Sequence, residues 1–192
     1  LNFCTVDLSA FYFDIRKDTL YCDTLDSSKR KSTIIFLNIL VEILLKWFAP
    51  ILSFTTEEIY RLVNKVEENS IHLKNFIQIP EIWKNEELNL NWDKIKKIRD
   101  EANISIEAQR ANKSIGSSLE ADIKIKLKKN YFTIAENNDF SEICITSSAS
   151  ITLDDKMEKD IEVICEKALG KKCPVCWKIS KTNCKKHGHL KN

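Results

Sequence analysis

Four potential metal ligands near the C-terminus constrain this chain more than any other feature. Cys173 and Cys176 form a C-x-x-C pair, and Cys184 and His187 form a C-x-x-H pair shortly after it. Two such pairs can supply a tetrahedral Zn²⁺ site of three thiolates and one imidazole. A segment of about 20 residues with hardly any apolar residues has little else to fold around. The spacing therefore predicts one structural zinc ion in a C-terminal zinc-binding knuckle, residues 169–192.

Two alternatives to this ligand set stay open. His189 lies two residues beyond His187 and could replace it as the fourth ligand. A thioredoxin-like redox pair is the other interpretation of C-x-x-C, although no βαβ pattern surrounds the pair and a second Cys/His pair lies nearby. The chain has seven cysteines and no secretion signal, which favours the reducing cytoplasm over a disulfide framework. The remaining cysteines lie in apolar contexts that suggest core positions: Cys4, Cys22, Cys144 and Cys165.

Positive charge gathers around the predicted zinc ligands. Residues 167–192 contain eight lysines and no acidic residue, whereas the net charge of the whole chain is only +2. Trp177 directly follows the second ligand, and Lys178 and Lys181 follow Trp177. Lysines neutralise phosphates and an exposed aromatic ring stacks on unpaired bases, so this pattern predicts RNA binding. The alternative is that Trp177 packs onto the zinc module as its core residue.

Residues 1–68 are predicted to be helical and to pack as a small antiparallel bundle. The second helix has an apolar stripe at three- and four-residue steps, formed by Ile34, Leu37, Val41, Leu44 and Phe48. Pro50 ends this helix, and Thr55 with Glu58 fits a capping box that starts the next one. Charged residues and Pro50 interrupt the apolar stretch, so we expect a buried helix and no membrane span.

The rest of the chain predicts an irregular connection at residues 69–92 and a helix plus a small α/β module at residues 93–168. The helix would start at Asp93 as N-cap and run to about Asn112. Residues 121–127 alternate between apolar and charged side chains, which predicts a half-buried strand. Further strand patterns occur at "EICIT", "SASITL" and "IEVICEKA". The expected fold class is mainly α, with a helical bundle followed by the small α/β module and the knuckle.

Four segments of the chain, in this order, resemble the C-terminal third of bacterial-type isoleucyl-tRNA synthetases. They are "NFCTVDLSAFYFDIRKDTLYCD", "WFAPILSFTTEEIY", "QRANKSIGSSLEA" and "KKCPVCW". The resemblance implies an anticodon-binding bundle of the class I synthetase type, a small α/β region, and a zinc module that contacts the anticodon end of the tRNA. Cys173, Cys176, Trp177 and Cys184 match the family by position. His187 stands where the family usually has a fourth cysteine, the loop between the pairs is shorter, and Val175 replaces an arginine.

The resemblance also implies what the chain would do. It would bind the anticodon stem-loop of isoleucine tRNA as part of a cytoplasmic, monomeric isoleucine–tRNA ligase, whose catalytic domain attaches isoleucine using ATP and Mg²⁺. The two ATP-binding sequences of that family and its editing domain do not occur in these 192 residues, so no catalytic residue is expected here. The N-terminal residues carry neither an initiator Met nor a signal peptide, and we expect a piece of a longer protein. The rival interpretation is a free-standing zinc-knuckle RNA-binding or regulatory protein derived from this region.

Four further basic residues are candidates for phosphate contacts. Arg16 and Lys17 lie near the end of the first predicted helix, and Arg110 and Lys113 flank a helix terminus just before Gly116. Such contacts position a nucleic acid without reading its sequence. The alternative for each of them is a solvated surface charge.

Overall fold

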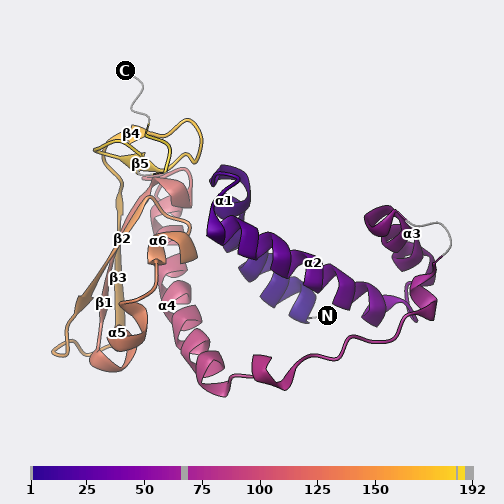
Figure 1. Cartoon of the computed structure of the whole chain (residues 1–192). Coiled ribbons are helices and arrows are strands. Elements are labelled where there is room, and N and C mark those ends of the chain that lie inside the picture. The colour runs from indigo at the N-terminus through magenta and orange to yellow at the C-terminus, as the bar shows by residue number, and fades with distance from the viewer. Residues whose placement is uncertain (1, 66–68, 185, 189–192) are drawn as a thin grey trace. The chain divides into compact units, whose positions relative to one another are not determined.

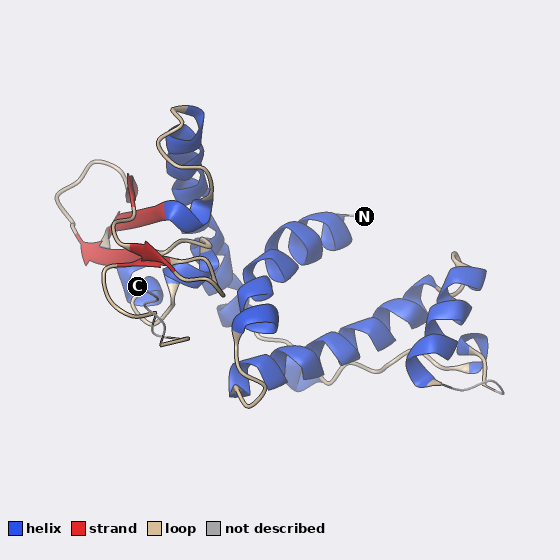
Figure 2. Ribbon diagram, turned by 90° about the horizontal axis from the view of Figure 1, so that it is seen from above, coloured by secondary structure: helices blue, strands red, loops and turns tan. Residues whose placement is uncertain are grey.

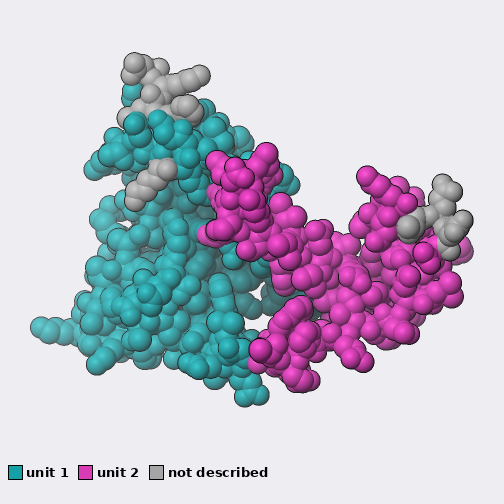
Figure 3. Space-filling model, viewed as in Figure 1, with its two compact units in different colours: residues 1–22, 85–192 teal, residues 23–84 magenta. Residues whose placement is uncertain are grey.

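A computed structural model of the chain describes residues 2–65, 69–184 and 186–188 (Figure 1). The protein is helix-rich and has a small sheet, as Figure 2 shows by secondary structure. It divides into two compact units, drawn in different colours in Figure 3. Unit 1 comprises Leu1–Cys22 and Asn85–Asn192, and unit 2 comprises Asp23–Lys84. The four-part division expected from the sequence and the class I type of bundle stay predictions.

The described residues of unit 2 form two helices and two short 3-10 turns. These are α2 (Ser28–Phe48), α3 (Ser53–Asn64), η2 (Ile71–Leu73) and η3 (Glu81–Trp83). Ser27 caps α2, because its hydroxyl accepts a hydrogen bond from the backbone N–H of Arg30 at 3.3 Å. A small core cluster joins α2 to η2, with Leu45, Ala49 and Ile71 buried and the Tyr60 ring packed against them.

The buried face of α2 differs from the predicted stripe. Its buried residues are Thr33, Leu40, Ile43 and Leu45, whereas the side chains of Ile34 and Val41 are exposed. Apolar side chains of α2 point to several of its faces, so more than one apolar stripe fits the helical period. Contacts with other elements determine which stripe is buried. The predicted capping box is also wrong, because α3 begins at Ser53 after Leu52 and Thr55 lies inside it. No helix among the described residues combines the length and the apolar character that crossing a membrane requires.

Unit 1 starts with a continuous helical segment and continues after unit 2 with a long helix and the sheet. The segment consists of η1 (Phe3–Phe13), which has the wider π-helical winding, and α1 (Asp14–Cys22). The other elements are α4 (Glu86–Ala111), η4 (Ser118–Glu120), β1 (Ala121–Leu127), α5 (Lys129–Ala135), α6 (Phe140–Ile143), β2 (Ser148–Leu153), β3 (Ile161–Lys167), β4 (Lys171–Lys172) and β5 (Ile179–Ser180).

The core of unit 1 lies between α4 and a three-stranded mixed sheet of order β2-β1-β3 (Figure 1). β1 pairs in parallel with β2 and antiparallel with β3, with Ile123 opposite Cys165. The apolar positions of β1 are fully buried and join a core with Ile98 and Ala102 of α4. Its lysines lie on the other face of the strand, where Lys124 pairs with Glu166 at 2.9 Å. The alternating sequence of residues 121–127 thus forms the half-buried strand that it predicts.

Two boundaries in unit 1 differ from the predictions. Helix α4 begins at Glu86, because the Asn85 side chain caps it by accepting from the N–H of Leu88 at 2.8 Å. Asp93 therefore lies inside the helix. The "EICIT" segment lies in the short helix α6 and the turn after it, and the carboxylate of Asp139 caps that helix. A local side-chain cap thus outweighs the β-propensity of these residues.

Candidate metal centre and nucleic-acid interface

The first pair of predicted ligands lies at the tip of a two-stranded hairpin. β4 and β5 pair antiparallel, with Lys172 opposite Ile179. In the turn between them, the N–H of Cys173 donates to the carbonyl of Lys178 at 2.9 Å, and the N–H of Trp177 donates to the carbonyl of Cys173 at 3.0 Å. These bonds curl the backbone so that both cysteine side chains are buried on the same side of the turn, where a single ion can be bound.

One glycine is required where this hairpin begins. Gly170 has φ +132°, and a Cβ atom there would lie 2.1 Å from the carbonyl oxygen of Ser180. Only glycine tolerates both that backbone conformation and such a close approach of another backbone segment. Gly170 therefore allows the chain to leave β3 and enter the knuckle.

The second pair meets the first in a compact cluster. Ligand atoms of Cys173, Cys176, Cys184 and His187 all lie within 4.8 Å of one another. The Nδ1 atom of His187 is 3.5 Å from the Cys173 sulfur and 3.4 Å from the Cys184 sulfur, and the sulfurs of Cys176 and Cys184 are 3.7 Å apart.

These separations fit a tetrahedral zinc site and do not fit a disulfide. Around one Zn²⁺ ion, with Zn–S about 2.3 Å and Zn–N about 2.1 Å, neighbouring sulfurs lie about 3.8 Å apart and sulfur and nitrogen about 3.6 Å apart. A disulfide would need a sulfur–sulfur distance of about 2.0 Å. All seven cysteines are free. The four-residue cluster is therefore compatible with a zinc site, and the alternative ligand His189 lies outside the described residues.

The pKa values of two thiols in this cluster are shifted in opposite directions. Burial alone would raise the pKa of Cys173, but N–H donors from Cys176 and Val175 and the neighbouring thiols lower it to about 6. Burial raises the pKa of Cys176 to about 12, and its neighbouring thiols add to the increase. Three crowded sulfurs cannot all ionise without a compensating cation, whereas a divalent ion deprotonates the thiols that bind it. The donor set thus favours a soft divalent metal.

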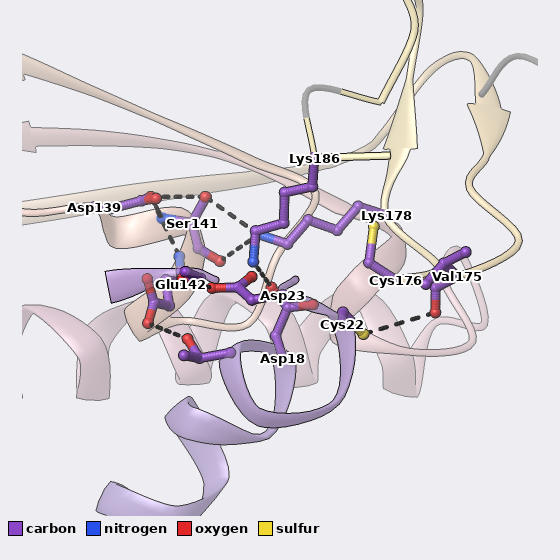
Figure 4. A network of polar contacts seen from close by, with 12 residues as sticks. Asp18, Cys22, Asp23, Asp139, Ser141, Glu142, Val175, Cys176, Lys178 and Lys186 are labelled. Atoms are coloured by element: carbon purple, nitrogen blue, oxygen red, sulfur yellow. Dashed lines mark hydrogen bonds and ion pairs between the residues drawn. The ribbon is translucent and has the colours of Figure 1, made fainter. Parts of the chain in front are cut away.

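His187 makes a second contact with its other ring nitrogen. Nε2 lies 2.8 Å from the carbonyl oxygen of Cys22, at the C-terminal end of α1. Because a carbonyl oxygen can only accept, Nε2 is the donor, and this hydrogen bond is the main cause of a raised pKa of His187. Figure 4 shows two further contacts at the same place. The Lys186 ammonium pairs with Asp18, and the Cys22 thiol lies 3.8 Å from the carbonyl oxygen of Val175.

Trp177 is exposed and adopts a strained backbone conformation. Its φ is +63°, in the left-handed region that costs a non-glycine residue about 1–2 kcal/mol. The Trp177 side chain is 58% exposed, and the Lys172 ammonium lies 5.4 Å from the centre of its ring. The ring therefore does not serve as the buried core of the knuckle. Backbone strain of this kind is typical of functional sites.

A cleft of about 890 Å³ lies beside the knuckle within unit 1. Its lining includes Lys124, Lys178, Lys181 and Lys186 together with the carboxylates of Asp139 and Glu166. Lys178 is half-buried and donates to the backbone oxygen and the hydroxyl of Ser141, both at 3.3 Å (Figure 4). Lys181 is exposed. Of the two lysines predicted to contact RNA, Lys181 is therefore the more accessible.

The two basic residues predicted in the first helix have internal partners. Arg16 donates to the Glu142 carboxylate at 2.8 Å and lies over the Tyr12 ring, and its side chain is only 23% exposed. Lys17 pairs with Asp14 at 3.0 Å and is more exposed. Arg16 thus links α1 to α6, which is a structural role.

Arg110 and Lys113 lie close together at the C-terminal end of α4. Both line a hollow of about 510 Å³ that also includes Gly116. Arg110 pairs with Glu107 at 2.6 Å, and Lys113 has a φ of +56°, which ends the helix. The assignment of these basic residues, and of Trp177, to RNA binding stays a prediction.

Sequence reasoning missed the contacts between the knuckle and α1. Cys22 and Asp18 are separated from His187 and Lys186 by 165 and 168 positions in the chain. Both lie in the first of the four segments quoted above, but spacing within that segment gives no signal of a partner in the knuckle.

Comparisons with known proteins agree with this architecture. The family model "Anticodon-binding domain of tRNA ligase" matches residues 1–125. The chain is 62% identical to an isoleucine–tRNA ligase from Pelagibacter ubique over 187 residues, and the match covers 97% of this chain and 20% of the relative. Isoleucine–tRNA ligases from Methylacidiphilum infernorum and Agrobacterium fabrum are 43% and 40% identical, with matches that cover 93% and 94% of this chain and 19% of each relative.

The chain therefore spans about a fifth of the length of the curated relatives it matches, and the matched part is their C-terminal region. The family match over residues 1–125 covers most of the helical part and the first strand of the sheet. On this basis, the chain belongs to the anticodon-binding domain family of tRNA ligases.

Proposed function

We propose that this chain is the tRNA-recognition region of an isoleucine–tRNA ligase, and that its knuckle binds one structural Zn²⁺ ion and contacts the anticodon stem-loop of isoleucine tRNA. Cys173, Cys176, Cys184 and His187 would hold the ion, which supplies no reaction and only fixes the fold of the knuckle. In the cytoplasmic, monomeric full-length enzyme, activation of isoleucine with ATP and Mg²⁺ would take place in the catalytic part that this chain does not match. The chain by itself would recognise tRNA without catalysis.

The observation that carries this proposal is the exposed Trp177 ring next to the four-residue Cys/His cluster. The ring is 58% exposed and lies against the Lys172 ammonium. A base can stack on such a ring while lysines neutralise the adjacent phosphates. The strained φ of Trp177 supports this role, because glycine would be the less costly residue if only the fold of the turn mattered.

The decisive experiment replaces Trp177 with glycine in the zinc-loaded chain. Trp177→Gly removes the ring and relieves the left-handed backbone, so zinc affinity should be retained or improved. Loss of one base–aromatic stack should weaken binding of isoleucine tRNA by roughly 1–3 kcal/mol, about 5-fold to 150-fold. Trp177→Phe serves as the matched control because it keeps an aromatic ring, and its loss should be smaller.

The same measurement with an altered anticodon tests specificity. Wild-type chain at one stated salt concentration should bind the native anticodon more tightly, and this preference should decrease in Trp177→Gly. If Trp177→Gly retains zinc and binds both tRNAs as tightly as the wild type does, the Trp177 ring of the knuckle does not contribute to anticodon recognition. If the wild type binds both equally with strong salt dependence, only general electrostatic attraction remains.

A further inference from the structure

The knuckle contacts the C-terminal end of α1. The last carbonyls of an α-helix have no partner within the helix. At the end of α1, the carbonyl of Cys22 accepts from Nε2 of His187 at 2.8 Å. The knuckle thus supplies a helix cap from a position 165 residues away.

The two nitrogens of His187 serve two different functions. Nδ1 faces the sulfurs of Cys173 and Cys184 at 3.5 and 3.4 Å, where the metal would lie. Nε2 faces the helix end. In a neutral imidazole only one nitrogen carries a proton, and a metal on Nδ1 leaves that proton on Nε2. Nε2 is then the donor that the Cys22 carbonyl requires.

Two further contacts support the same connection. The Lys186 ammonium pairs with Asp18, one turn before the end of α1, and the Cys22 thiol approaches the Val175 carbonyl at 3.8 Å (Figure 4). Positive charge near a helix C-terminus is favourable because the helix dipole is negative there. Cys22 is also the last residue of unit 1 before the chain enters unit 2.

We propose that His187 has two functions, with Nδ1 binding the metal and Nε2 capping α1 at Cys22. Binding of the metal would thereby stabilise the end of α1, where the chain leaves unit 1. This inference rests on the proposed zinc site and goes beyond it. A fourth cysteine would bind the metal equally well but could not cap the helix, because a metal-bound thiolate has no second donor. His187 is in this sense a positioning residue for α1.

The test compares the wild-type chain with His187→Cys, both loaded with metal. Cobalt substitution first establishes ligation, because the visible spectrum of Co²⁺ differs between three sulfurs with one nitrogen and four sulfurs. Hydrogen exchange then reads the last turn of α1, residues 17–22. A typical net hydrogen bond corresponds to about a fivefold factor, so these amides should exchange about fivefold faster in His187→Cys. Exchange in β1 should not change.

Three controls distinguish the possible failures. Thr182→Ala, an exposed knuckle substitution, should leave the exchange of α1 unchanged. If His187→Cys does not bind metal, the wild-type chain with and without zinc provides the same comparison, and removal of zinc should accelerate exchange in residues 17–22. If the wild type binds no metal, the proposed zinc site itself fails. If metal binds and neither comparison alters α1, the capping role of His187 is refuted.

Discussion

Asp139 shows how a single side chain defines local structure in unit 1. Its carboxylate accepts from the N–H groups of Ser141 and Glu142 at 2.9 and 3.3 Å, and from the Ser141 hydroxyl at 2.7 Å. These bonds satisfy N–H groups of α6 that have no partner within the helix. α6 in turn presents Glu142 to Arg16 of α1 and Ser141 to Lys178 of the knuckle. One cap therefore stabilises contacts with two other parts of unit 1.

We expect Asp139→Ala to lower the free energy of unfolding of unit 1 by about 1 kcal/mol, the usual cost of removing an N-cap. Urea unfolding at pH 7, followed by circular dichroism, would measure this loss. Asp139→Asn is the matched control, because the amide oxygen still accepts, and most of the stability should be retained. Equal losses in the two variants would contradict a capping role.

The stabilisation by Asp139 should depend on pH. Burial alone would raise its pKa, but the Ser141 hydroxyl, the Lys178 ammonium and the backbone N–H donors together lower the pKa below its usual value. A carboxyl whose pKa is lowered on folding stabilises the fold above its unfolded pKa and loses that contribution as pH falls through the folded value. The difference in unfolding free energy between wild type and Asp139→Ala should thus decrease below about pH 4. A difference in unfolding free energy that stays constant down to pH 2 would contradict this pH dependence.

At the residue level, the sequence predicts the Cys/His cluster better than its surroundings. The two Cys/His pairs lie within short stretches of chain, so spacing alone identifies Cys173, Cys176, Cys184 and His187 as a cluster, which the structure brings together. The capping contact of His187 joins residues far apart in the chain, and no local pattern encodes it. Arg16 shows the same limit, because its partner Glu142 lies 126 positions away.

At the level of elements, strands were easier to predict than helix boundaries. β1, β2 and β3 occur where the strand patterns place them, and the alternation of buried and more exposed positions is clearest in β1. The start of α4 was missed by eight residues, because the N-cap is Asn85 and not the predicted Asp93. The Asn85 cap that starts it precedes a stretch with a weak apolar period. The buried face of α2 was also missed, because partners outside the helix determine it.

The central strand β1 should be the most sensitive element to truncation. Ile125 is fully buried between the neighbouring strands and α4, and a fully buried Ile→Ala change costs about 2–5 kcal/mol. We expect Ile125→Ala to lower the unfolding free energy of unit 1 by that amount, measured by urea denaturation. Lys126→Ala on the opposite face removes only a partly exposed pair with Glu162 and should change stability by less than about 1 kcal/mol. Similar effects of both changes would contradict the one-sided burial of β1.

At the scale of the whole molecule, removal of the metal should have a local effect. The main core cluster of unit 1 ends at Cys165 and contains none of the four predicted ligands. With EDTA, we expect hydrogen exchange to accelerate in residues 169–188, and at the end of α1 if His187 caps it, while β1, β2 and β3 keep their protection. Added Zn²⁺ should restore the original exchange. Loss of protection throughout the sheet would show that the knuckle is needed for the core.

The division of the chain into units has a consequence for the order in which it can fold during synthesis. Unit 1 consists of Leu1–Cys22 and Asn85–Asn192, with all of unit 2 between them. The partner of Arg16, Glu142, is synthesised 126 residues later, which takes roughly 6–25 s at ribosomal speeds of about 5–20 residues per second. During that time η1 and α1 expose Leu8 and Ile15, which are buried in the folded protein. Unit 2, whose residues are contiguous, can fold first on the ribosome, and the N-terminal helix must wait for the last third of the chain.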